Sequence, residues 1–210
     1  KDREDIKSVL IDGNSVQIVT YFTSDPLYEF NISDPKNIWL ESELEIPGFS
    51  AYLHNIDDTE LTVGLGFTDD WHLKVELYDQ SGTDSSVLGT IEMDSRTYSP
   101  ATYDYKAFTS FDYKEDQLFK IALPIQRWGY YNNENGNQYT NKAGLWLIEV
   151  DYSQTPATLN VINDIEMTDK PEDVYQSRAV IRGTAVHYAL NGEVYSTEFA
   201  SDGTVHSTAD

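Results

Sequence analysis

The sequence predicts an all-β fold made of repeated four-stranded antiparallel sheets, and three observations support this. Residues 47–94 contain four short runs rich in β-branched and aromatic residues, separated by turn residues. In one of these runs, Leu73, Val75 and Leu77 alternate with polar neighbours, which is typical of a strand with two different faces. No segment shows a sustained apolar period of about 3.6 residues, so almost no helix is expected. Four short strands in a unit of this length are typical of one blade of a β-propeller.

This unit repeats along the chain. The turns after the third strand of each unit begin at Asn31, Asp79, Asp151 and Ala200, which are separated by 48, 72 and 49 residues. The middle interval is longer because it contains residues 127–142, which are expected to form a long polar loop. Without that insertion, the spacing matches a blade period of ~45–50 residues. The sequence therefore predicts that residues 1–210 form a β-propeller domain or a fragment of one, with four blades at about 6–46, 47–94, 98–167 and 176–207.

The chain is strongly acidic, with 36 acidic and 14 basic residues and a formal net charge of −22. Phosphate binding needs patches of Lys and Arg, so this charge argues against nucleic acid and anionic membrane surfaces as partners. Two interpretations of the acidity stay open. One is a solvated surface that maintains solubility, and the other is capture of a cation, with Ca²⁺ favoured because its ligands are oxygens.

Three absences in the sequence limit the kinds of site and the location that the protein can have. The chain has no cysteine, which excludes disulfides and thiolate metal sites. No apolar run approaches the ~20 residues that cross a bilayer, so insertion into a membrane is not expected. The N-terminus shows no signal peptide, as in a mature product or a fragment of a longer protein.

Short motifs follow one another in a fixed order. They are SDPLY at 24–28, ISDP at 32–35, EIPGFS at 45–50, YLH at 52–54, LKV at 73–75, LYD at 77–79, YSP at 98–100 and DYKAF at 104–108. Together they resemble bacterial and archaeal secreted proteins with a C-terminal β-propeller domain, distantly related to WD40 propellers, over about residues 6–200. The resemblance implies a propeller fold, a secreted or cell-envelope location and a longer parent domain, of which these are the last four blades. It implies no catalytic role.

The sequence departs from that family pattern at two places. Tyr105 stands where the family usually has histidine, and Ser81-Gly82 stands where it has Asp-Pro. A ligand role of that histidine therefore does not transfer to this chain.

In a propeller, the connections between blades and those between the second and third strands of a blade emerge on one face. We expect the binding residues on that face. Loops on a rigid scaffold are the usual carriers of function. A mixture of aromatic and hydrogen-bonding side chains suits a protein or glycan ligand. The expected ligand-binding residues are Ser50, Tyr52, His54, Trp71, His72, Tyr103, Tyr105, Trp128, Tyr130 and Tyr131. The expected metal ligands, for Ca²⁺, are Asp69, Asp70 and Asp104.

Each of these groups also has a structural interpretation. Residues 69–72 fit a solvated acidic turn, residues 127–142 fit an insertion without a ligand, and His54 fits a hydrogen-bonded wall residue. Residues 127–142 resemble a calcium loop only loosely, because the regular acidic spacing is missing.

Enzyme signatures are absent from the sequence. It contains no G-x-S-x-G elbow, no H-E-x-x-H motif, no phosphate-binding glycine loop and no dinucleotide fingerprint. The sequence therefore favours a non-catalytic, extracytoplasmic binding or scaffold module. The alternatives are a calcium-stabilised propeller with a structural ion, and a hydrolase with a carboxylate or metal site on the loop-rich face. The expected partners are a protein or glycan ligand, and the rest of the parent chain or a second copy to close the propeller.

Overall fold

A computed structural model describes residues 5–21, 25–81, 85–93, 96–133, 136–168 and 173–208. In these residues the regular secondary structure consists of β-strands and three short 3-10 helices, so the predicted all-β fold is confirmed. The chain divides into two compact units, Lys1–Met93 and Asp94–Asp210. Within the described part, no helix is long and apolar enough to cross a membrane.

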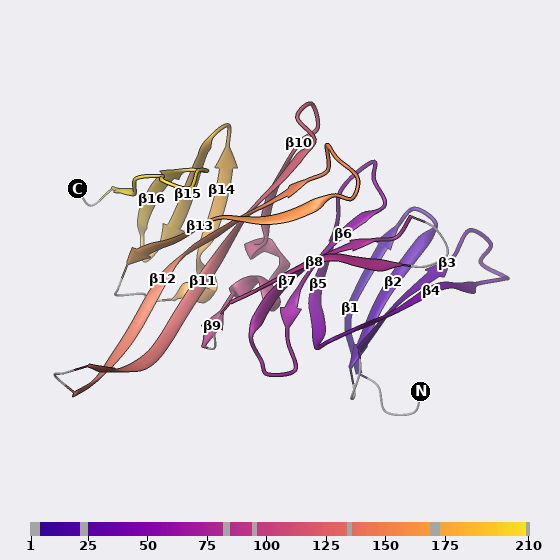
Figure 1. Cartoon of the computed structure of the whole chain (residues 1–210), viewed down its shortest axis with the longest axis horizontal. Coiled ribbons are helices and arrows are strands. Elements are labelled where there is room, and N and C mark those ends of the chain that lie inside the picture. The colour runs from indigo at the N-terminus through magenta and orange to yellow at the C-terminus, as the bar shows by residue number, and fades with distance from the viewer. Residues whose placement is uncertain are drawn as a thin grey trace. The chain divides into compact units, whose positions relative to one another are not determined.

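The first unit contains two four-stranded antiparallel sheets, each with its strands in chain order (Figure 1). The first sheet consists of β1 (Asp5–Asp12), β2 (Ser15–Tyr21), β3 (Asp25–Asn31) and β4 (Trp39–Ile46). The second sheet consists of β5 (Phe49–Asn55), β6 (Leu61–Phe67), β7 (Leu73–Asp79) and β8 (Ser86–Glu92). Each strand pairs with the next one along the chain, as expected for propeller blades.

The second unit also contains two antiparallel sheets. One consists of β10 (Thr109–Tyr113), β11 (Leu118–Asn133), β12 (Gly136–Asp151) and β13 (Thr158–Thr168), and the short β9 (Thr97–Tyr98) also pairs with β11. The other consists of β14 (Arg178–Arg182), β15 (Ala185–Leu190), β16 (Glu193–Glu198) and β17 (His206–Ser207). The 3-10 helices are η1 (Pro100–Thr102), η2 (Tyr105–Ala107) and η3 (Val174–Gln176).

The prediction of a long loop at residues 127–142 is wrong. In the structure, β11 and β12 are long neighbouring strands (Figure 1), and their pairing continues without a register shift until Asn133 faces Gly136. The polar character of this stretch concealed its aromatic residues, which favour strands. The dipeptide Asn135-Gly136 is also a strong hairpin signal. The insertion therefore extends the third sheet, which gives its exposed residues a rigid support.

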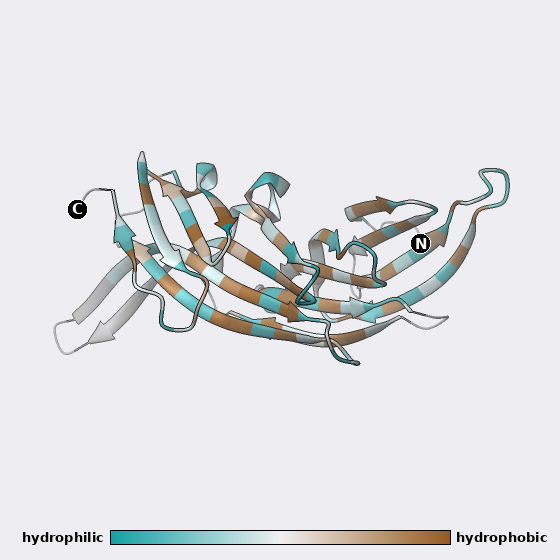
Figure 2. Ribbon diagram, turned by 90° about the horizontal axis from the view of Figure 1, so that it is seen from above, coloured by the Kyte–Doolittle hydropathy of each residue, from teal (hydrophilic) through white to brown (hydrophobic). Residues whose placement is uncertain are grey.

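Strands in Figure 2 change between hydrophilic and hydrophobic along their length, as the predicted alternation requires. In β7, however, both faces are buried. On one face, Tyr78 packs with residues of the first sheet and of β5 in a shared apolar core. Its members are Val19, Leu27, Ile46, Phe49, Leu53 and Tyr78. Because the first sheet covers this face, the polar residues Lys74 and Glu76 are enclosed with Tyr78 and need internal partners.

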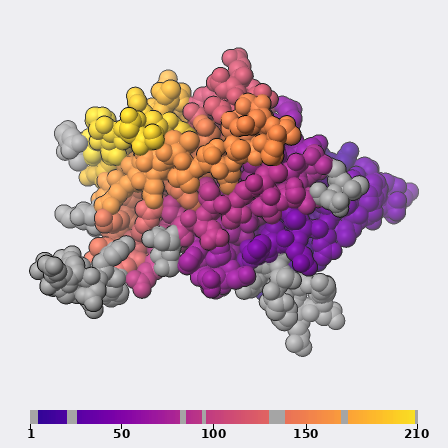
Figure 3. Space-filling model, in the orientation of Figure 1, coloured from indigo at the N-terminus to yellow at the C-terminus, as the bar shows by residue number. Residues whose placement is uncertain are grey.

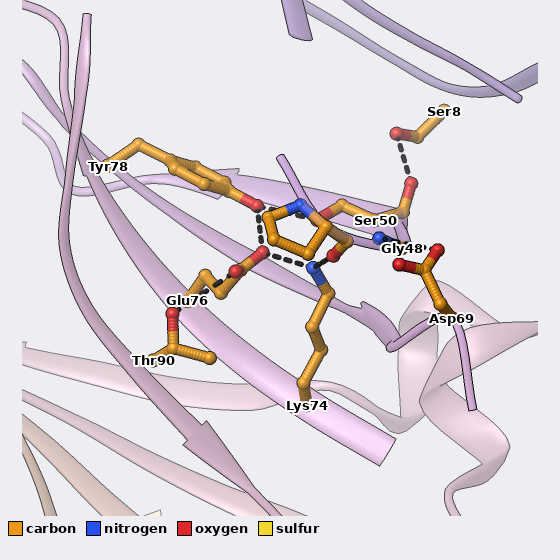
Figure 4. A network of polar contacts seen from close by, with 9 residues as sticks. Ser8, Gly48, Ser50, Asp69, Lys74, Glu76, Tyr78 and Thr90 are labelled. Carbon is orange, nitrogen blue, oxygen red and sulfur yellow. Dashed lines mark hydrogen bonds and ion pairs between the residues drawn. The ribbon is translucent and has the colours of Figure 1, made fainter. Parts of the chain in front are cut away.

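Those partners form the buried network in Figure 4. The Lys74 ammonium group donates to Glu76 Oε2 at 2.6 Å and to the backbone oxygen of Pro47. The Tyr78 hydroxyl donates to the same Glu76 oxygen at 2.6 Å, and Thr90 donates to Glu76 Oε1 at 3.1 Å. Burial, and secondarily the negative charge of Glu76, raise the pKa of Tyr78, so its phenol remains a donor. This network joins β7 to β8 and to the start of β5.

In the second unit, the two sheets also share one apolar core. Leu145 and Leu147 of β12 and Ile165 of β13 pack with Val186 and Tyr188 of β15. Figure 3 shows the orange β13 region directly beside the yellow C-terminal sheet on the visible surface. Both sheets contribute side chains to this closely packed core. The third sheet is therefore rigid and fixes the positions of the residues on it.

The edge strand β1 exposes several apolar side chains. Ile6, Val9 and Ile11 are each more than half exposed. Burying apolar area is favourable, so such a row suits coverage by another surface. The expectation that further chain or a second copy packs on the domain stays a prediction.

Candidate functional site

Four aromatic rings meet in the second unit, and we call them the aromatic platform. Tyr98 lies at the centre, with ring-centroid distances of 5.2 Å to Tyr175, 5.6 Å to Tyr103 and 6.3 Å to Trp128. These spacings are typical of favourable aromatic pairs. Tyr98 is only 7% exposed, whereas Tyr103, Tyr175 and Trp128 are 78%, 65% and 40% exposed. The platform is therefore a buried ring surrounded by three rings that present surface to solvent.

Strand pairing sets the positions of Tyr98 and Trp128. Tyr98 of β9 lies opposite Gln126 of β11. The backbone N–H of Trp128 donates to the Arg96 carbonyl at 3.2 Å. Gln126 and Trp128 are two residues apart on β11, so their side chains lie on the same face. The long hairpin thus holds Trp128 beside Tyr98.

The short helix η1 positions Tyr103. Ser99 is its N-cap, and its hydroxyl accepts from the Ala101 N–H at 3.3 Å and donates to the Pro124 carbonyl at 2.7 Å. Tyr103 follows as the C-cap, and its N–H donates to the Pro100 carbonyl at 3.1 Å. A capped turn anchored to β11 therefore presents this highly exposed ring.

Helix η3 contributes the remaining ring, Tyr175. The Ser177 hydroxyl closes this helix by donating to the Val174 carbonyl at 2.6 Å. Arg178 donates to the Tyr175 carbonyl at 3.3 Å and forms an ion pair with Asp104. This ion pair ties η3 to the segment that carries Tyr103 and Tyr105.

Polar groups lie next to the platform. Asn141 of β12 lies directly opposite Trp128, so the two side chains share a face. The Gln126 amide donates to the Asn141 amide oxygen at 2.8 Å. Nearby, Lys106 lies over the exposed ring of Tyr105, 5.8 Å from its centroid. A ligand that stacks on the rings would therefore find amide donors and acceptors beside them.

The Tyr98 hydroxyl is buried and has no hydrogen-bond partner among the described residues. Burial, and secondarily the neighbouring phenols of Tyr175 and Tyr103, raise the pKa of Tyr98. The group therefore stays neutral. Tyr98 contributes to the platform through its buried ring, which packs against the three neighbouring rings.

The structure places the predicted residues of this unit as follows. Tyr103 and Trp128 belong to the platform, and Tyr105 is exposed beside it on η2. Tyr130 and Tyr131 continue along β11, but their side chains lie outside the described residues. Tyr98 and Tyr175 were not among the predicted ligand residues. Tyr98 could have been found from its place in the YSP motif, whereas nothing local distinguishes Tyr175, because only folding brings η3 to β9.

In the first unit, the expectation that Ser50 faces a ligand is wrong. Ser50 is completely buried, and its hydroxyl is 2.9 Å from the Tyr78 hydroxyl. The first sheet covers this end of β5, and Ser8 of β1 donates to the Ser50 carbonyl at 2.9 Å. Ser50 therefore belongs to the core network of Figure 4.

The other predicted residues of this unit do not gather into one site. Trp71 is exposed at a positive φ of 62° and packs on Phe49 and Phe67, with both centroid distances 5.8 Å. His72 is partly buried, and its backbone N–H donates to the Thr68 hydroxyl at 3.1 Å. Tyr52 and His54 are partly buried on one face of β5, with the Tyr52 hydroxyl 2.9 Å from His54 Nδ1. This pair fits the wall interpretation of His54.

His54 gives a pH prediction for stability. Burial lowers the pKa of His54, and the negative charge of Asp57 opposes the shift. As pH falls below about 6.5, the unfolded state takes up this proton before the folded state does, so the free energy of unfolding decreases. We expect His54→Asn to reduce the stability loss between about pH 7 and pH 5, measured by urea unfolding at both values. An unchanged pH dependence in the variant would contradict this assignment.

The predicted metal ligands stay a prediction. Asp69 accepts from the Gly48 N–H at 3.2 Å, and Asp70 is exposed in the following turn. Asp104 caps η2 by accepting from the Lys106 N–H at 3.0 Å and also pairs with Arg178. Among the described residues, no group of three or more His, Asp or Glu side chains is placed to share an ion.

Comparison with known proteins identifies the family. A model described as "Beta propeller domain" matches residues 1–201. The chain belongs to this β-propeller domain family. The domain is 38% identical over 128 residues to an uncharacterized protein of Methanocaldococcus jannaschii, covering 60% of this chain and 20% of that protein. It is 39% identical over 146 residues to an uncharacterized protein of Archaeoglobus fulgidus, covering 70% and 22%. The chain thus spans about a fifth of the length of these relatives.

Two solved structures are similar to the β-propeller domain at low sequence identity. One is a functionally unknown protein from Desulfotomaculum acetoxidans, with 12% identity, a TM-score of 0.40 and coverage of 96% of this chain and 68% of that one. The other is a periplasmic gluconolactonase of Pseudomonas aeruginosa, with 8% identity, a TM-score of 0.38 and coverage of 94% and 69%.

Proposed function

We propose that this β-propeller domain is a non-catalytic binding module whose aromatic platform binds a neutral carbohydrate chain. The observation that carries the proposal is the grouping of Tyr103, Trp128 and Tyr175 around Tyr98, with three rings exposed. Rigid aromatic rings supply contact area at a low cost in conformational entropy. The platform is built on paired strands and capped turns, so little ordering is required when a ligand binds.

The chemistry around the rings favours a sugar. The C–H face of a sugar ring is apolar and can cover an aromatic ring, while its hydroxyl groups both donate and accept hydrogen bonds. The amides of Gln126 and Asn141 lie on the face that carries Trp128 and offer complementary groups. The net charge of −22 disfavours anionic polymers. An extracytoplasmic location, where such chains are exposed, is part of the proposal and rests on the resemblance to secreted proteins.

The test is affinity electrophoresis in gels that contain soluble mannan, xylan or β-glucan, followed by titration of tryptophan fluorescence with the retarding polymer. We expect Trp128→Ala to weaken binding by about 1–2 kcal/mol, roughly 5–30-fold, because it removes one stacking face. Trp71→Ala is the matched control, since Trp71 is exposed but belongs to the other unit.

Three outcomes would contradict the proposal. They are no retardation by any neutral polymer, equal weakening by the two tryptophan variants, and preferential binding of anionic polygalacturonate. Thermal melting of each variant separates loss of the site from loss of the fold. Tyr175→Ala provides a second check, because Tyr175 contributes an exposed ring from a different element.

A further inference from the structure

The first sheet has two apolar sides. Val19 of β2 and Leu27 of β3 lie on one side and pack in the core shared with the second sheet. On the other side, residues that face each other across β1, β2 and β3 form two apolar rows, because cross-strand partners share a face. The first row is Val9, Ile18 and Tyr28, and the second is Ile11, Val16 and Phe30. We call these six residues the apolar face.

The apolar face is most open to solvent along its edge strand. Val9 and Ile11 of β1 are 51% and 66% exposed, and the other four residues are partly buried. At the opposite edge, Glu43 of β4 lies on the same side of the sheet, opposite Tyr28. An exposed apolar surface with a polar rim is typical of an interaction surface.

The internal repeat shows which neighbour this face would have. One residue before the repeat position of each sheet lie Phe30, Tyr78, Val150 and Phe199. Tyr78 packs in a core with the preceding, first sheet, and Phe199 packs in a core with the preceding, third sheet. Tyr78, Val150 and Phe199 are 0%, 0% and 8% exposed, whereas Phe30 is only partly buried. The apolar face, which carries Phe30, is therefore the side on which a preceding sheet would pack.

A second set of equivalent residues marks the opposite side of each sheet. Four residues before each repeat position lie Leu27, Val75, Leu147 and Ser196. Leu27 packs in a core with the following, second sheet, and Leu147 packs in a core with the following, fourth sheet. Leu27, Val75 and Leu147 are at most 1% exposed, whereas Ser196 is only partly buried. Of the four sheets, the fourth therefore leaves the side that meets a following sheet open to solvent.

This open side of the fourth sheet carries apolar and basic residues. The cross-strand row through Ser196 contains Val180, His187 and His206. Val180 is 56% exposed, and Val194 on the same side is 38% exposed. We call this side, with Val180, His187, Val194, Ser196 and His206, the fourth-sheet face.

The two faces also differ in charge. Arg178 and Arg182 lie on the side of the fourth-sheet face with one acidic residue, Glu198. Glu43 and Glu45 lie on the side of the apolar face. The fourth-sheet face is thus net basic and the apolar face is bordered by acidic groups, so the two are complementary in charge.

We propose that the apolar face binds the fourth-sheet face of a second copy of this chain. The contact repeats the packing seen inside each unit, where the side that meets a following sheet packs on the side that meets a preceding sheet. Each copy carries both faces, so the contact is either returned in a closed pair or continued in a longer chain of copies. This association does not depend on carbohydrate binding by the aromatic platform.

The experiment measures the mass of the full chain by sedimentation velocity and light scattering from about 1 to 100 µM. We expect particles of two or more copies. Val9→Glu should raise the dissociation constant at least ~10-fold, because it places an unpaired carboxylate in the apolar contact. Val161→Glu is the matched control, since Val161 of β13 is 45% exposed and belongs to neither face, and it should have no effect. Thermal melting checks that each variant is folded.

A mixing experiment tests which faces meet. Val180→Glu alters the fourth-sheet face and should dissociate the chain as Val9→Glu does. Each of these variants keeps the face that the other has lost. An equimolar mixture of Val9→Glu and Val180→Glu should therefore recover association, as one copy of each joined by a single intact contact.

Four results would overturn the proposal. A monomeric mass up to about 100 µM would show that no second copy binds. Equal dissociation by Val161→Glu and Val9→Glu would show that added charge, and not the apolar face, is responsible. Association of Val180→Glu by itself would show that the apolar face pairs with its own copy. A mixture that stays monomeric would show that the two faces do not meet.

Discussion

Replacing Lys74 with methionine is expected to lower the free energy of unfolding by about 3–5 kcal/mol. Lys74 and Glu76 are 1% and 2% exposed, and their ion pair is 2.6 Å long. Methionine has a similar volume but leaves the Glu76 carboxylate buried without its counter-ion. Tyr78 and Thr90 still donate to Glu76, but neutral donors do not offset the cost of a buried charge.

Urea unfolding followed by tryptophan fluorescence measures this change. Lys142→Met is the matched control, because Lys142 pairs with Glu166 at 2.7 Å with side chains that are 40% and 47% exposed. Water screens that pair, so its loss should cost less than about 1 kcal/mol. The double change of Lys74 to methionine and Glu76 to leucine should recover part of the stability, since no charge is left unpaired. Equal effects of Lys74→Met and Lys142→Met would refute the role given to the buried pair.

Replacing Gly66 with alanine is expected to cost at least about 3 kcal/mol, because no space exists for a methyl group. A Cβ at this position would lie 1.8 Å from the Phe49 carbonyl oxygen and 2.7 Å from the Ser50 Cα. Both are backbone atoms of β5, which pairs with β6 at Ser50 and Gly66. Relief would require the two strands to separate, which would also disturb the Ser50–Tyr78 contact.

Gly13→Ala is the control for this experiment. Gly13 has a positive φ of 54°, and a Cβ there would meet nothing within 4 Å. Its replacement should cost only the backbone strain, about 1 kcal/mol. Urea unfolding of both variants should therefore separate crowding from strain. If Gly66→Ala were no more destabilising than Gly13→Ala, this result would contradict the conclusion that β5 and β6 lie too close together at Gly66 for a side chain.

Much of the fold could be predicted because its signals are local. The short runs and turns of residues 47–94 become β5 to β8, and the alternation around Val75 becomes the two faces of β7. Residues 127–142 are predicted as a loop because they contain many asparagines, which are common in loops, but they form strands. Trp128 and its neighbours form a strand because β11 and β12 pair in register there.

The candidate site could be predicted only in part. Trp128 and Tyr103 stand out as aromatic residues in polar surroundings, which is a signal that a sequence carries by itself. Tyr98 and Tyr175 join them because β9 pairs with β11 and because Arg178 binds Asp104 across the unit.

The sequence by itself determined most of the strands, because side-chain period and turn chemistry act over a few residues. It also determined the acidity, from which we predict that nucleic acid and anionic membrane surfaces are not partners. Only the tertiary structure decided which polar side chains are solvated. Lys74 and Glu76 alternate with apolar residues as surface residues do, yet the first sheet covers them. A strand pattern specifies two faces, but whether water or another sheet lies on the second face depends on segments far away in the chain.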